Sequence, residues 1–454
     1  MVAGDQSDPA DVLIIGGGPA GYVCALRAAQ NGRSVTLIER SRLGGVCLNE
    51  GCIPSKQLAA FAAAKAGAER MAAAGMPAFA GAPDMIAFQK GRGATILTLV
   101  KGVAALLEAA GVKTVTGNAW FVGRTRLCVE VGEESVRYFD FKDVVIATGS
   151  SAAPMEGLPF DDDRVVEPAR ALEWRFLPET LLVAGDDYVA LELAVAYARL
   201  GSRVTLVTKS MRLLPDFDPD ISAAAQRGAK AIGIDVLLSE DPAARANGAE
   251  RVIVSAERRP NLDHLQLAAA GIAPAASHLI VDDHLRINRH VFAIGDVTVG
   301  LPLAHRAMAQ GRVVGDILGG KPAAMDVHAV PRAVFAEPEI AAAGSTEAAA
   351  RDVGVEVDVG RFPLAALGRA VAQSATSGFA KLVFARQSGI LIGAHLAGPR
   401  ATELIAEMAL AIEMGATAED IALTVHAHPT FAESLMEAAE VALGRPIHVR
   451  LPKR

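Results

Sequence analysis

Three glycines in the spacing Gly16-x-Gly18-x-x-Gly21 constrain the fold of this chain more than any other feature. They follow an apolar run at residues 11–15 and open an alanine-rich stretch that continues to about Asn31. In such a strand, turn and helix, the first glycine permits the tight turn and the second lets the backbone approach a pyrophosphate. The third lets the helix pack closely on the strand. The pattern predicts a dinucleotide-binding unit whose helix N-terminus faces the anion.

An acidic residue at the expected distance along the sequence supports this prediction. A second strand is expected from Ser34 to Ile38, and it ends at Glu39, which lies 39 − 21 = 18 residues beyond Gly21. This is close to the spacing of about 20 residues that places an acid on a ribose. We therefore expect Glu39 to accept hydrogen bonds from the ribose of an adenosine half.

Length and composition bound the remaining possibilities. A chain of 454 residues predicts about three domains at roughly 150 residues each. Although 51% of the residues are hydrophobic, no run approaches the roughly 20 apolar residues of a membrane span. The first ten residues are polar and unlike a secretory signal, so we expect a cytoplasmic protein. The 44 basic and 51 acidic residues are mixed along the chain, so nucleic acid is not an expected partner.

Directly after the first unit, the segment GGVCLNEGCIPSK carries two of the four cysteines, Cys47 and Cys52. A close cysteine pair in a reducing compartment is typical of catalysis or metal binding. The Cys-x4-Cys spacing is looser than that of a zinc knuckle, and no second Cys or His pair lies nearby, so no metal site is predicted. Two buried core thiols are the remaining alternative, but they would not explain a Gly-, Pro-, Ser- and Lys-containing segment beside a dinucleotide fold.

The segment GGVCLNEGCIPSK resembles the active-site segment of the class I pyridine nucleotide-disulfide oxidoreductases, most closely that of the dihydrolipoamide dehydrogenases. The resemblance runs nearly end to end. It implies that FAD binds the glycine-rich unit, that Cys52 lies next to the flavin, and that Cys47 is the interchange thiol facing the substrate. It also implies that Lys56 sits beside the flavin ring and pairs there with Glu192. The residue types suit these roles, because a thiolate is the reactive form of cysteine and a cationic neighbour lowers a thiol pKa.

Two further apolar strands resemble the split FAD domain of this family. The first ends in a small-residue turn at Thr148 and Gly149, where the chain would leave the first half of the domain. The second, at residues 291–296, ends in Asp296, which by resemblance hydrogen-bonds the ribityl chain of FAD.

We therefore predict an α/β fold with two Rossmann-like domains, one for FAD and one shortened NAD-type domain, plus a C-terminal α+β dimerisation domain. The expected boundaries are 1–152 for the first part of the FAD domain, 153–258 for the shortened NAD(P)-type domain, 259–327 for the second part of the FAD domain and 328–454 for the dimerisation domain.

The second dinucleotide unit departs from the family pattern. It keeps Gly185, but Asp187 stands where the second glycine should admit the pyrophosphate, and Ala190 replaces the third glycine. A carboxylate about 4 Å from a phosphate would repel it by about 4 kcal/mol at an effective dielectric constant of 20. NAD is expected from the family, but its site looks degraded.

Other departures lie further along the same unit. The next strand ends in Thr208 and Lys209 instead of an acid, and Glu257 replaces the glycine before an Arg-Arg-Pro motif. Only residues 239–250 stand where the family inserts a small β-meander. A switch to NADP, with Lys209 and Arg212 receiving a 2′-phosphate, would leave the new acidic residues unexplained. Loss of ordinary pyridine-nucleotide binding fits every departure, and a quinone or a second redox protein would then accept the electrons.

The last third of the chain, with mixed strands and alanine-rich helices, resembles the dimerisation domain of the family. Its sequence HAHPTFAE closely matches the catalytic-base motif, with His428 as the base and Glu433 as its orienting carboxylate. A base that titrates near neutrality suits dithiol chemistry. A bare His-x-His could instead be a metal half-site or a structural pair, but the cysteines and the full motif favour catalysis. In the family this motif closes the active site of the other subunit, so a homodimer is implied.

The predicted activity is the oxidation of a dihydrolipoyl group, presented by a lipoyl-bearing carrier protein or a 2-oxoacid dehydrogenase-type complex, through a Cys47–Cys52 disulfide. Mercuric reductase and the large thioredoxin reductases need a C-terminal thiol pair, but no Cys follows Cys128. Glutathione reductase carries a Lys where Ser55 stands. A non-enzymatic flavoprotein subunit or redox sensor is the alternative from another class, and the intact catalytic residues argue against it.

Overall fold

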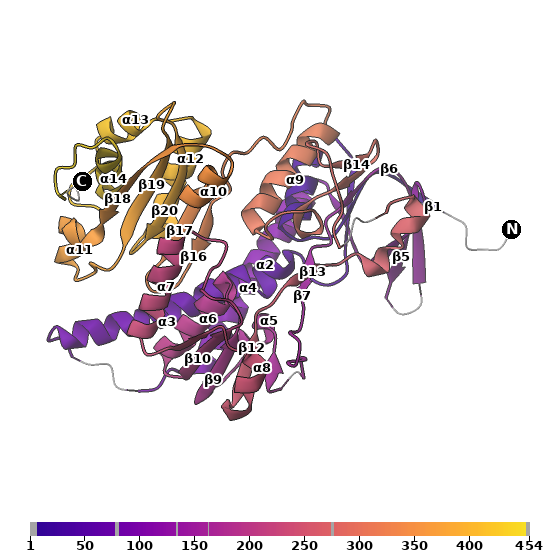
Figure 1. The fold of residues 1–454 in the computed structure, drawn as a ribbon. Helices are drawn as coiled ribbons and strands as arrows, with labels where there is room; N and C mark the ends of the chain where they lie inside the picture. Colours follow the sequence, from indigo (N-terminus) through magenta and orange to yellow (C-terminus); the bar gives the residue numbers. More distant parts are fainter. Residues whose placement is uncertain (1–6, 78–80, 133–134, 162, 274–276, 451–454) are drawn as a thin grey trace.

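The computed structural model describes residues 7–77, 81–132, 135–161, 163–273 and 277–450. Figure 1 shows two N-terminal units, one built on a mixed sheet and one on a parallel sheet, and a third unit, coloured orange to yellow, built on the last third of the chain. Within the described residues, no helix is long and apolar enough to cross a membrane.

The first sheet is assembled from two distant parts of the chain, in the strand order β14-β15-β6-β1-β2-β3, with β5 paired to β6 and β4 to β5. Strand β1 runs parallel to both β2 and β6, and Ile15 lies opposite Ile38 and Ile146. Strand β15 runs parallel to β6 on its other side. The strands are β1 (Ser7–Ile15), β2 (Val35–Glu39), β3 (Lys113–Thr116), β4 (Asn118–Gly123), β5 (Arg126–Val131), β6 (Ser135–Ile146), β14 (Arg286–Asn288) and β15 (Val291–Ala293).

Helices α1 (Pro19–Gln30) and α9 (Ala304–Leu318) pack against each other beside this sheet. Pro19 begins α1, where its fixed φ suits the first helical turn and its missing N–H costs nothing. Gly311 permits the close approach, because a Cβ there would lie 2.6 Å from the Ala20 carbonyl oxygen.

The second sheet is entirely parallel, in the order β11-β10-β9-β12-β8. Between β11 and β12 the described chain forms only α8 (Pro242–Arg245) and a short 3-10 turn, with no added strands. The strands are β8 (Val165–Val166), β9 (Thr180–Ala184), β10 (Arg203–Thr208), β11 (Asp235–Leu238) and β12 (Arg251–Val254). The accompanying helices are α5 (Pro168–Ala171), α6 (Tyr188–Leu200) and α7 (Pro219–Ala231).

A two-stranded antiparallel ribbon of β7 (Ser150–Ala152) and β13 (Arg258–Pro260) joins the two N-terminal units. These strands lie where the chain enters and leaves the second unit. They coincide with the region of the predicted boundaries at residues 152 and 258, which themselves stay predictions.

The C-terminal sheet is antiparallel, in the order β16-β17-β20-β19-β18. Its strands are β16 (Arg332–Val334), β17 (Ile340–Gly344), β18 (Val357–Pro363), β19 (Phe379–Ala385) and β20 (Leu391–Ala397). Its helices are α10 (Glu347–Asp352), α11 (Gly368–Ala372), α12 (Ala401–Glu413), α13 (Ala418–Leu423) and α14 (Glu433–Ala442).

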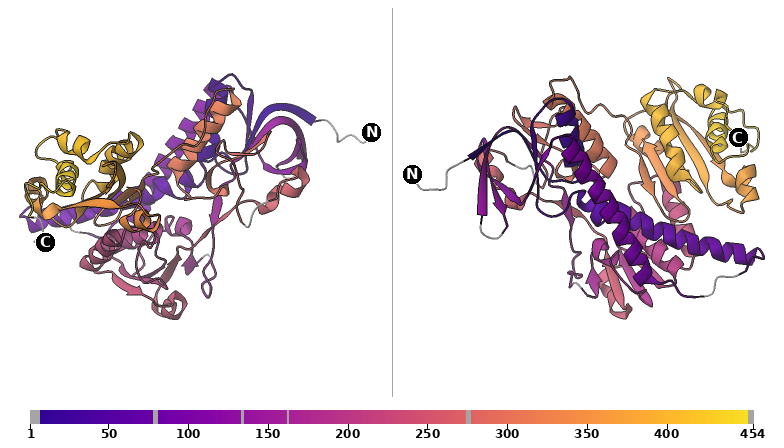
Figure 2. Two further views of the ribbon diagram at one scale, coloured as in Figure 1. Left: turned by 45° about the horizontal axis from the view of Figure 1, so that its top comes forward. Right: turned by 180° about the vertical axis from the view of Figure 1, so that it is seen from behind.

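Three helices connect β2 to β3 of the first sheet: α2 (Gly45–Asn49), α3 (Cys52–Ala73) and α4 (Met85–Ala109). Figure 2 shows that the far end of α3 extends beneath the C-terminal unit. Helix α3 also packs on α6 of the second sheet. A single apolar core includes Leu58 of α3, Leu193 of α6 and Phe379 of β19, so the units are held together by shared packing.

Candidate active site

The first glycine turn has the geometry that its spacing predicts. Gly16 has φ +106°, and a Cβ there would lie 2.3 Å from the Ala147 carbonyl oxygen. A Cβ on Gly21 would lie 1.8 Å from the Gly16 carbonyl oxygen. Gly18 is different, because the nearest atom to its added Cβ is 3.9 Å away. Gly18 therefore leaves open space at the start of α1, where no side chain caps the helix N-terminus.

Glu39 lies at the end of β2, beside this turn. Its Oε2 accepts a hydrogen bond from the Gly17 N–H at 2.6 Å, and its Oε1 accepts one from the Ser41 N–H at 2.8 Å. These bonds fix the carboxylate at the edge of a cavity of about 450 Å³.

This cavity brings together most of the residues predicted to bind FAD and to act on it. It is lined by Gly16, Gly18, Glu39, Cys47, Cys52, Lys56, Thr148, Gly149, Glu192 and Asp296, among others. Gly21 is not among its lining residues and acts by letting α1 pack against the turn. An uncapped helix N-terminus, a tight glycine turn with open space in front of Gly18 and a carboxylate at the strand end together fit an adenine dinucleotide.

Sequence reasoning missed a polar network that holds the far end of this cavity. The Ser150 hydroxyl donates to Asp296 Oδ2 at 2.6 Å and accepts from Arg258 Nε at 2.8 Å. The Thr148 hydroxyl donates to the Asn261 carbonyl oxygen at 2.8 Å. The only sequence signal for this network was the Arg-Arg-Pro motif that contains Arg258.

The two cysteines lie on either side of a tight connection between α2 and α3. Both are free, partly buried thiols in this structure. Asn49 braces the connection, because its Nδ2 donates to the carbonyl oxygens of Leu43 and Gly45 at 3.0 and 2.9 Å.

The two thiols differ in acidity. A hydrogen bond from Cys47, together with the positive charge of Lys56, lowers the pKa of Cys52 to about 7 against the opposing effect of burial. The same hydrogen bond and burial raise the pKa of Cys47. Cys52 is therefore the more acidic thiol of the pair, and the neighbouring Cys47 contributes to this as well as the Lys56 that the sequence suggested.

Lys56 is held beside the cysteines by a buried carboxylate. Its Nζ lies 2.9 Å from Glu192 Oε2 and 3.2 Å from Oε1, and Glu192 is only 4% exposed. Glu192 Oε1 also accepts from the Phe335 N–H at 3.0 Å, and the Phe335 ring lies 4.8 Å from the Lys56 ammonium. Phe335 comes from the C-terminal unit, and no sequence pattern indicated this contact.

The histidine motif forms a pair of its own on the C-terminal unit. His428 Nδ1 lies 2.8 Å from Glu433 Oε1, and Glu433 Oε2 accepts from the Thr430 N–H at 2.8 Å. Although burial opposes it, hydrogen bonding from His428 and Thr430 gives Glu433 a lowered pKa. A carboxylate on Nδ1 leaves Nε2 of the ring for substrate chemistry.

Within one chain the structure does not bring this pair to the cysteines. The His428 side chain is 77% exposed, and among the described residues its hydrogen-bond partner is Glu433. The neighbouring His426 is engaged elsewhere, with Nε2 2.9 Å from Glu407 and Nδ1 2.9 Å from the Thr424 carbonyl oxygen. No group of three or more metal-binding side chains occurs among the described residues.

The turn of the second dinucleotide unit carries a carboxylate at the helix N-terminus. Asp187 caps α6, and its Oδ1 accepts from the Ala190 N–H at 2.8 Å. The Ser255 hydroxyl lies 2.9 Å from each oxygen of Asp187. Burial raises the pKa of Asp187 against these hydrogen bonds. Ala190 itself is fully buried and fits the fingerprint, which accepts Gly or Ala at this position.

Comparison with known proteins agrees with this geometry. Residues 10–311 match the family model described as pyridine nucleotide-disulphide oxidoreductase. Residues 330–439 match the dimerisation domain of the same family. This chain belongs to the pyridine nucleotide-disulphide oxidoreductase family.

Two curated relatives within the family are each named dihydrolipoyl dehydrogenase. The protein from Geobacillus stearothermophilus is 40% identical over 469 residues, covering 99% of each chain. The protein from Haloferax volcanii is also 40% identical, over 475 residues and 99% of each chain.

Solved structures share the whole fold. LpdA from Mycobacterium tuberculosis aligns with a TM-score of 0.87 at 25% identity, covering 95% of this chain and 99% of its own. The HOCl-induced flavoprotein disulfide reductase RclA from Escherichia coli aligns with a TM-score of 0.82 at 26% identity, covering 94% and 98%.

The family assignment confirms the predicted fold class and the enzyme class. The protein is a dihydrolipoyl dehydrogenase-like flavoprotein disulfide oxidoreductase with FAD and a redox-active cysteine pair. Its dimerisation domain implies a homodimer. FAD and NAD are both expected from the family.

Proposed function

We propose that this enzyme oxidises dihydrolipoyl groups carried by a partner protein, and that its use of NAD as the electron acceptor is weakened or replaced. The thiol half of the proposal rests on the Cys47–Cys52 pair and on the relatives named dihydrolipoyl dehydrogenase. The acceptor half rests on Asp187. The carrier is a lipoyl-bearing protein, such as one in a 2-oxoacid dehydrogenase-type complex.

In the dithiol step, one sulfur of the substrate attacks Cys47 of the oxidised pair, and Cys52 leaves as a thiolate. The second substrate sulfur then attacks the first, which closes the lipoyl disulfide and releases Cys47 as a thiol. The two electrons of the substrate now reside on the cysteine pair. Hydrogen bonding and the Lys56 charge hold the pKa of Cys52 at about 7, so Cys52 suits the role of leaving thiolate.

His428 takes the proton of the attacking dithiol, and Glu433 holds the ring in position through Nδ1. Because the pair is exposed in one chain, we infer that it serves the cysteines of the other subunit. Apolar side chains on the same unit support a subunit contact there: Leu410, Met414, Leu423 and Val425 are 62%, 75%, 70% and 94% exposed. A homodimer would cover such surfaces.

The residues of this cavity would hold FAD, which would supply the two-electron acceptor between the cysteine pair and the final acceptor. We infer that Gly16, Gly18, Gly21 and Glu39 hold its adenosine half. At the other end Thr148, Gly149 and Asp296 hold its ribityl side, and Lys56 with Glu192 lies beside the ring. The Ser150 and Arg258 bonds to this region keep Asp296 in place.

A contrast between two helices is the observation that carries the proposal on NAD. Helix α1 has no side-chain cap, so its N–H groups are free for a pyrophosphate. Helix α6 is capped by the Asp187 carboxylate, which already accepts a hydrogen bond from the Ala190 N–H of that helix. A phosphate at α6 would have to displace or approach this negative group.

The cations near this unit are already engaged, which disfavours the alternative of a switch to NADP. Lys209 Nζ lies 3.4 Å from Asp241, and the Arg212 guanidinium donates to the Pro215 carbonyl oxygen. At the end of β10 the hydroxyl groups of Thr208 and Ser210 donate to Asp186, which adds a further carboxylate where a 2′-phosphate would be expected. Glu257 is exposed and does not line the cofactor cavity, so Asp187 carries the argument.

Steady-state turnover with dihydrolipoamide tests both halves. We expect a quinone acceptor to give a higher kcat/KM than NAD or NADP. A kcat/KM for NAD equal to or above that for quinones would overturn the acceptor half alone. If the flavin-loaded enzyme does not oxidise dihydrolipoamide with any of these acceptors, the substrate half is overturned and the non-enzymatic alternative is supported.

A further inference from the structure

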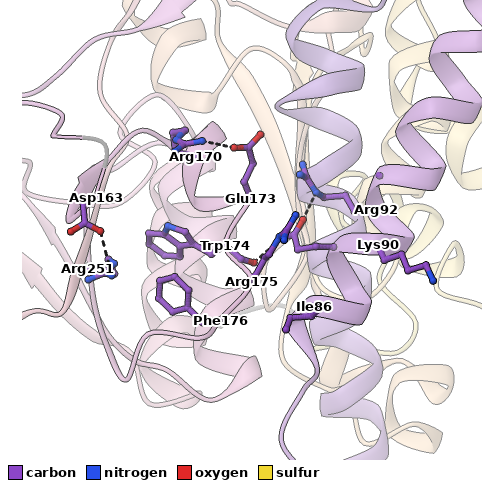
Figure 3. A pocket seen from close by; sticks show the side chains of 12 residues that line it. Ile86, Lys90, Arg92, Asp163, Arg170, Glu173, Trp174, Arg175, Phe176 and Arg251 are labelled. Carbon is purple, nitrogen blue, oxygen red and sulfur yellow. Dashed lines mark hydrogen bonds and ion pairs between the residues drawn. The ribbon is translucent and has the colours of Figure 1, made fainter.

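A second cavity, of about 780 Å³, lies outside the cofactor site. Figure 3 shows side chains of α4 on one side of it and side chains of residues 170–176 on the other. The short helix α5 separates the two cavities, since Pro168 and Ala169 line the cofactor cavity and Arg170 lines this one. The second cavity is lined by Ile86, Gln89, Lys90, Arg92, Gly93, Asp163, Arg170, Glu173, Trp174, Arg175, Phe176 and Arg251.

Cationic side chains dominate this lining, with five Lys or Arg residues against two carboxylates. Two of the cations are neutralised within the chain. Arg251 lies 3.5 Å from Asp163, and Arg170 lies 2.7 Å from Glu173. The other three, all without an ion pair among the described residues, give the cavity an excess of positive charge.

These unpaired cations are Lys90, Arg92 and Arg175, and Arg92 is the best fixed of them. Its Nε donates to Gln89 Oε1 at 2.5 Å. Gln89 is itself fixed, because its Nε2 donates to the carbonyl oxygens of Leu172 and Trp174 at 2.9 and 2.8 Å. The two terminal nitrogens of Arg92 have no acceptor among the described residues, although the side chain is half-buried.

Burial of a charge without an ion pair is unfavourable, and it lowers the pKa of Arg92 although the nearby Glu173 carboxylate opposes this. An external anion would relieve this cost, and a guanidinium held in a fixed orientation suits a phosphate group. The cavity therefore favours a ligand with several negative charges.

An aromatic wall adds a second preference. The rings of Trp174 and Phe176 stack with centroids 5.8 Å apart, and Phe176 is 39% exposed. The Arg251 guanidinium lies over the Phe176 ring at 5.2 Å. Aromatic and guanidinium planes are the surfaces on which nucleobases stack.

Helix α4 leaves room for such a ligand. Gly93 lies within the helix, where glycine is unfavourable, and nothing lies within 4 Å of the position of an added Cβ. Among the described residues no neighbouring atom requires this glycine, and Gly93 lines the cavity.

We propose that this cavity binds a nucleoside diphosphate, with its phosphates against Arg92 and Arg175 and its base against the Phe176 wall. The volume lies within the usual range for small-molecule sites, about 300–1,000 Å³. Because the site spans α4 of the FAD unit and residues 170–176 of the second unit, the ligand would bridge the two.

The test uses tryptophan fluorescence of the FAD-loaded dimer titrated with ADP. The chain has two tryptophans, Trp120 and Trp174, so in a Trp120→Phe background Trp174 reports alone. We expect saturable quenching by ADP, weakened at least tenfold by Arg92→Gln and by Arg175→Gln. Lys101→Gln, an exposed charge further along α4, is the matched control and should leave the dissociation constant unchanged.

Gly93→Glu provides a variant that leaves the arginines intact. It should abolish ADP binding through repulsion and blockage while flavin content and thermal stability stay normal, because the position is open. Equal dissociation constants for ADP with and without Arg92→Gln would overturn the proposal. So would a loss of ADP binding on Lys209→Gln, which would place the nucleotide at the second Rossmann unit. Pyrophosphate binding as tightly as ADP would overturn the nucleotide assignment in favour of a simple anion site.

Discussion

Replacement of Asp187 by asparagine is expected to raise the affinity for NAD. The change removes a negative charge from the N-terminus of α6 but keeps a side chain of the same size. The amide oxygen can still accept from the Ala190 N–H, 2.8 Å away in the native protein. A pyrophosphate bound at this N-terminus would lie about 4 Å from the carboxylate. At an effective dielectric constant of 20 the repulsion is about 4 kcal/mol, or roughly a thousandfold in affinity.

Two effects reduce this figure. Salt screens the repulsion, and burial raises the pKa of Asp187, so part of the charge is lost as the pH falls. We therefore expect a gain of about tenfold to a thousandfold at neutral pH. The affinity of the native enzyme for NAD should therefore rise on acidification, because Asp187 gains a proton. The affinity of the Asp187→Asn enzyme for NAD should not change in this way.

Calorimetric titration of the FAD-loaded enzyme with NAD measures this gain. Asp84→Asn is the matched control, because Asp84 caps α4 in the same way, accepting from the Ile86 and Ala87 N–H groups at 2.9 and 3.0 Å. Asp187→Gly should bind NAD at least as well as Asp187→Asn, since it also opens space. Dissociation constants of native protein and Asp187→Asn within twofold of each other would refute the reasoning.

Three further predictions concern the catalytic pair, the base and stability. Lys56→Met should raise the pKa of Cys52 above its value of about 7, seen as an upward shift in the pH titration of the thiolate absorbance; an unchanged titration would contradict this. His428→Gln should slow reduction by dihydrolipoamide about a hundredfold or more in stopped-flow measurements, with the flavin spectrum unchanged; a loss below threefold would exclude it as the base. The Lys381 side chain is 8% exposed and lies 3.0 Å from Asp218. Its carboxylate partners raise its pKa despite burial. Its contribution to the free energy of unfolding is therefore fully present below the usual lysine pKa and is lost only in alkali. Lys381→Met should then lower the free energy of unfolding in urea by about 3–5 kcal/mol, equally at pH 6 and 8; a loss under about 1 kcal/mol would contradict this.

Local geometry explains which parts of the site the sequence could predict. Gly16 and Gly21 are required by contacts within one turn, where an added Cβ would lie 2.3 and 1.8 Å from backbone oxygens. Such a requirement appears in the sequence as a fixed spacing. The cysteine and histidine motifs are equally local, because each functional pair lies within a few residues along the chain.

Contacts between distant segments were not predictable in this way. Ser150 bonds Asp296 across 146 positions and Arg258 across 108 positions. Phe335 reaches Glu192 from another unit, across 143 positions. Such pairs depend on how the sheets are placed, which no single motif records.

The acidity of the cysteines shows the same limit. The sequence indicated Lys56 as the group that would lower the pKa of Cys52. In the structure a hydrogen bond from Cys47 lowers this pKa together with Lys56. That bond depends on the turn between α2 and α3, which Asn49 braces through two backbone carbonyl groups.

Anaerobic reduction of the FAD-loaded enzyme by dihydrolipoamide tests the central claim most directly. The Cys52 thiolate beside the oxidised flavin should give a long-wavelength absorbance band, and NAD or a quinone is then added in separate experiments. We predict that the band forms, persists with NAD and decays with the quinone. Rapid decay with NAD would contradict the account of Asp187, and absence of the band would contradict the assignment of dihydrolipoyl groups as the substrate.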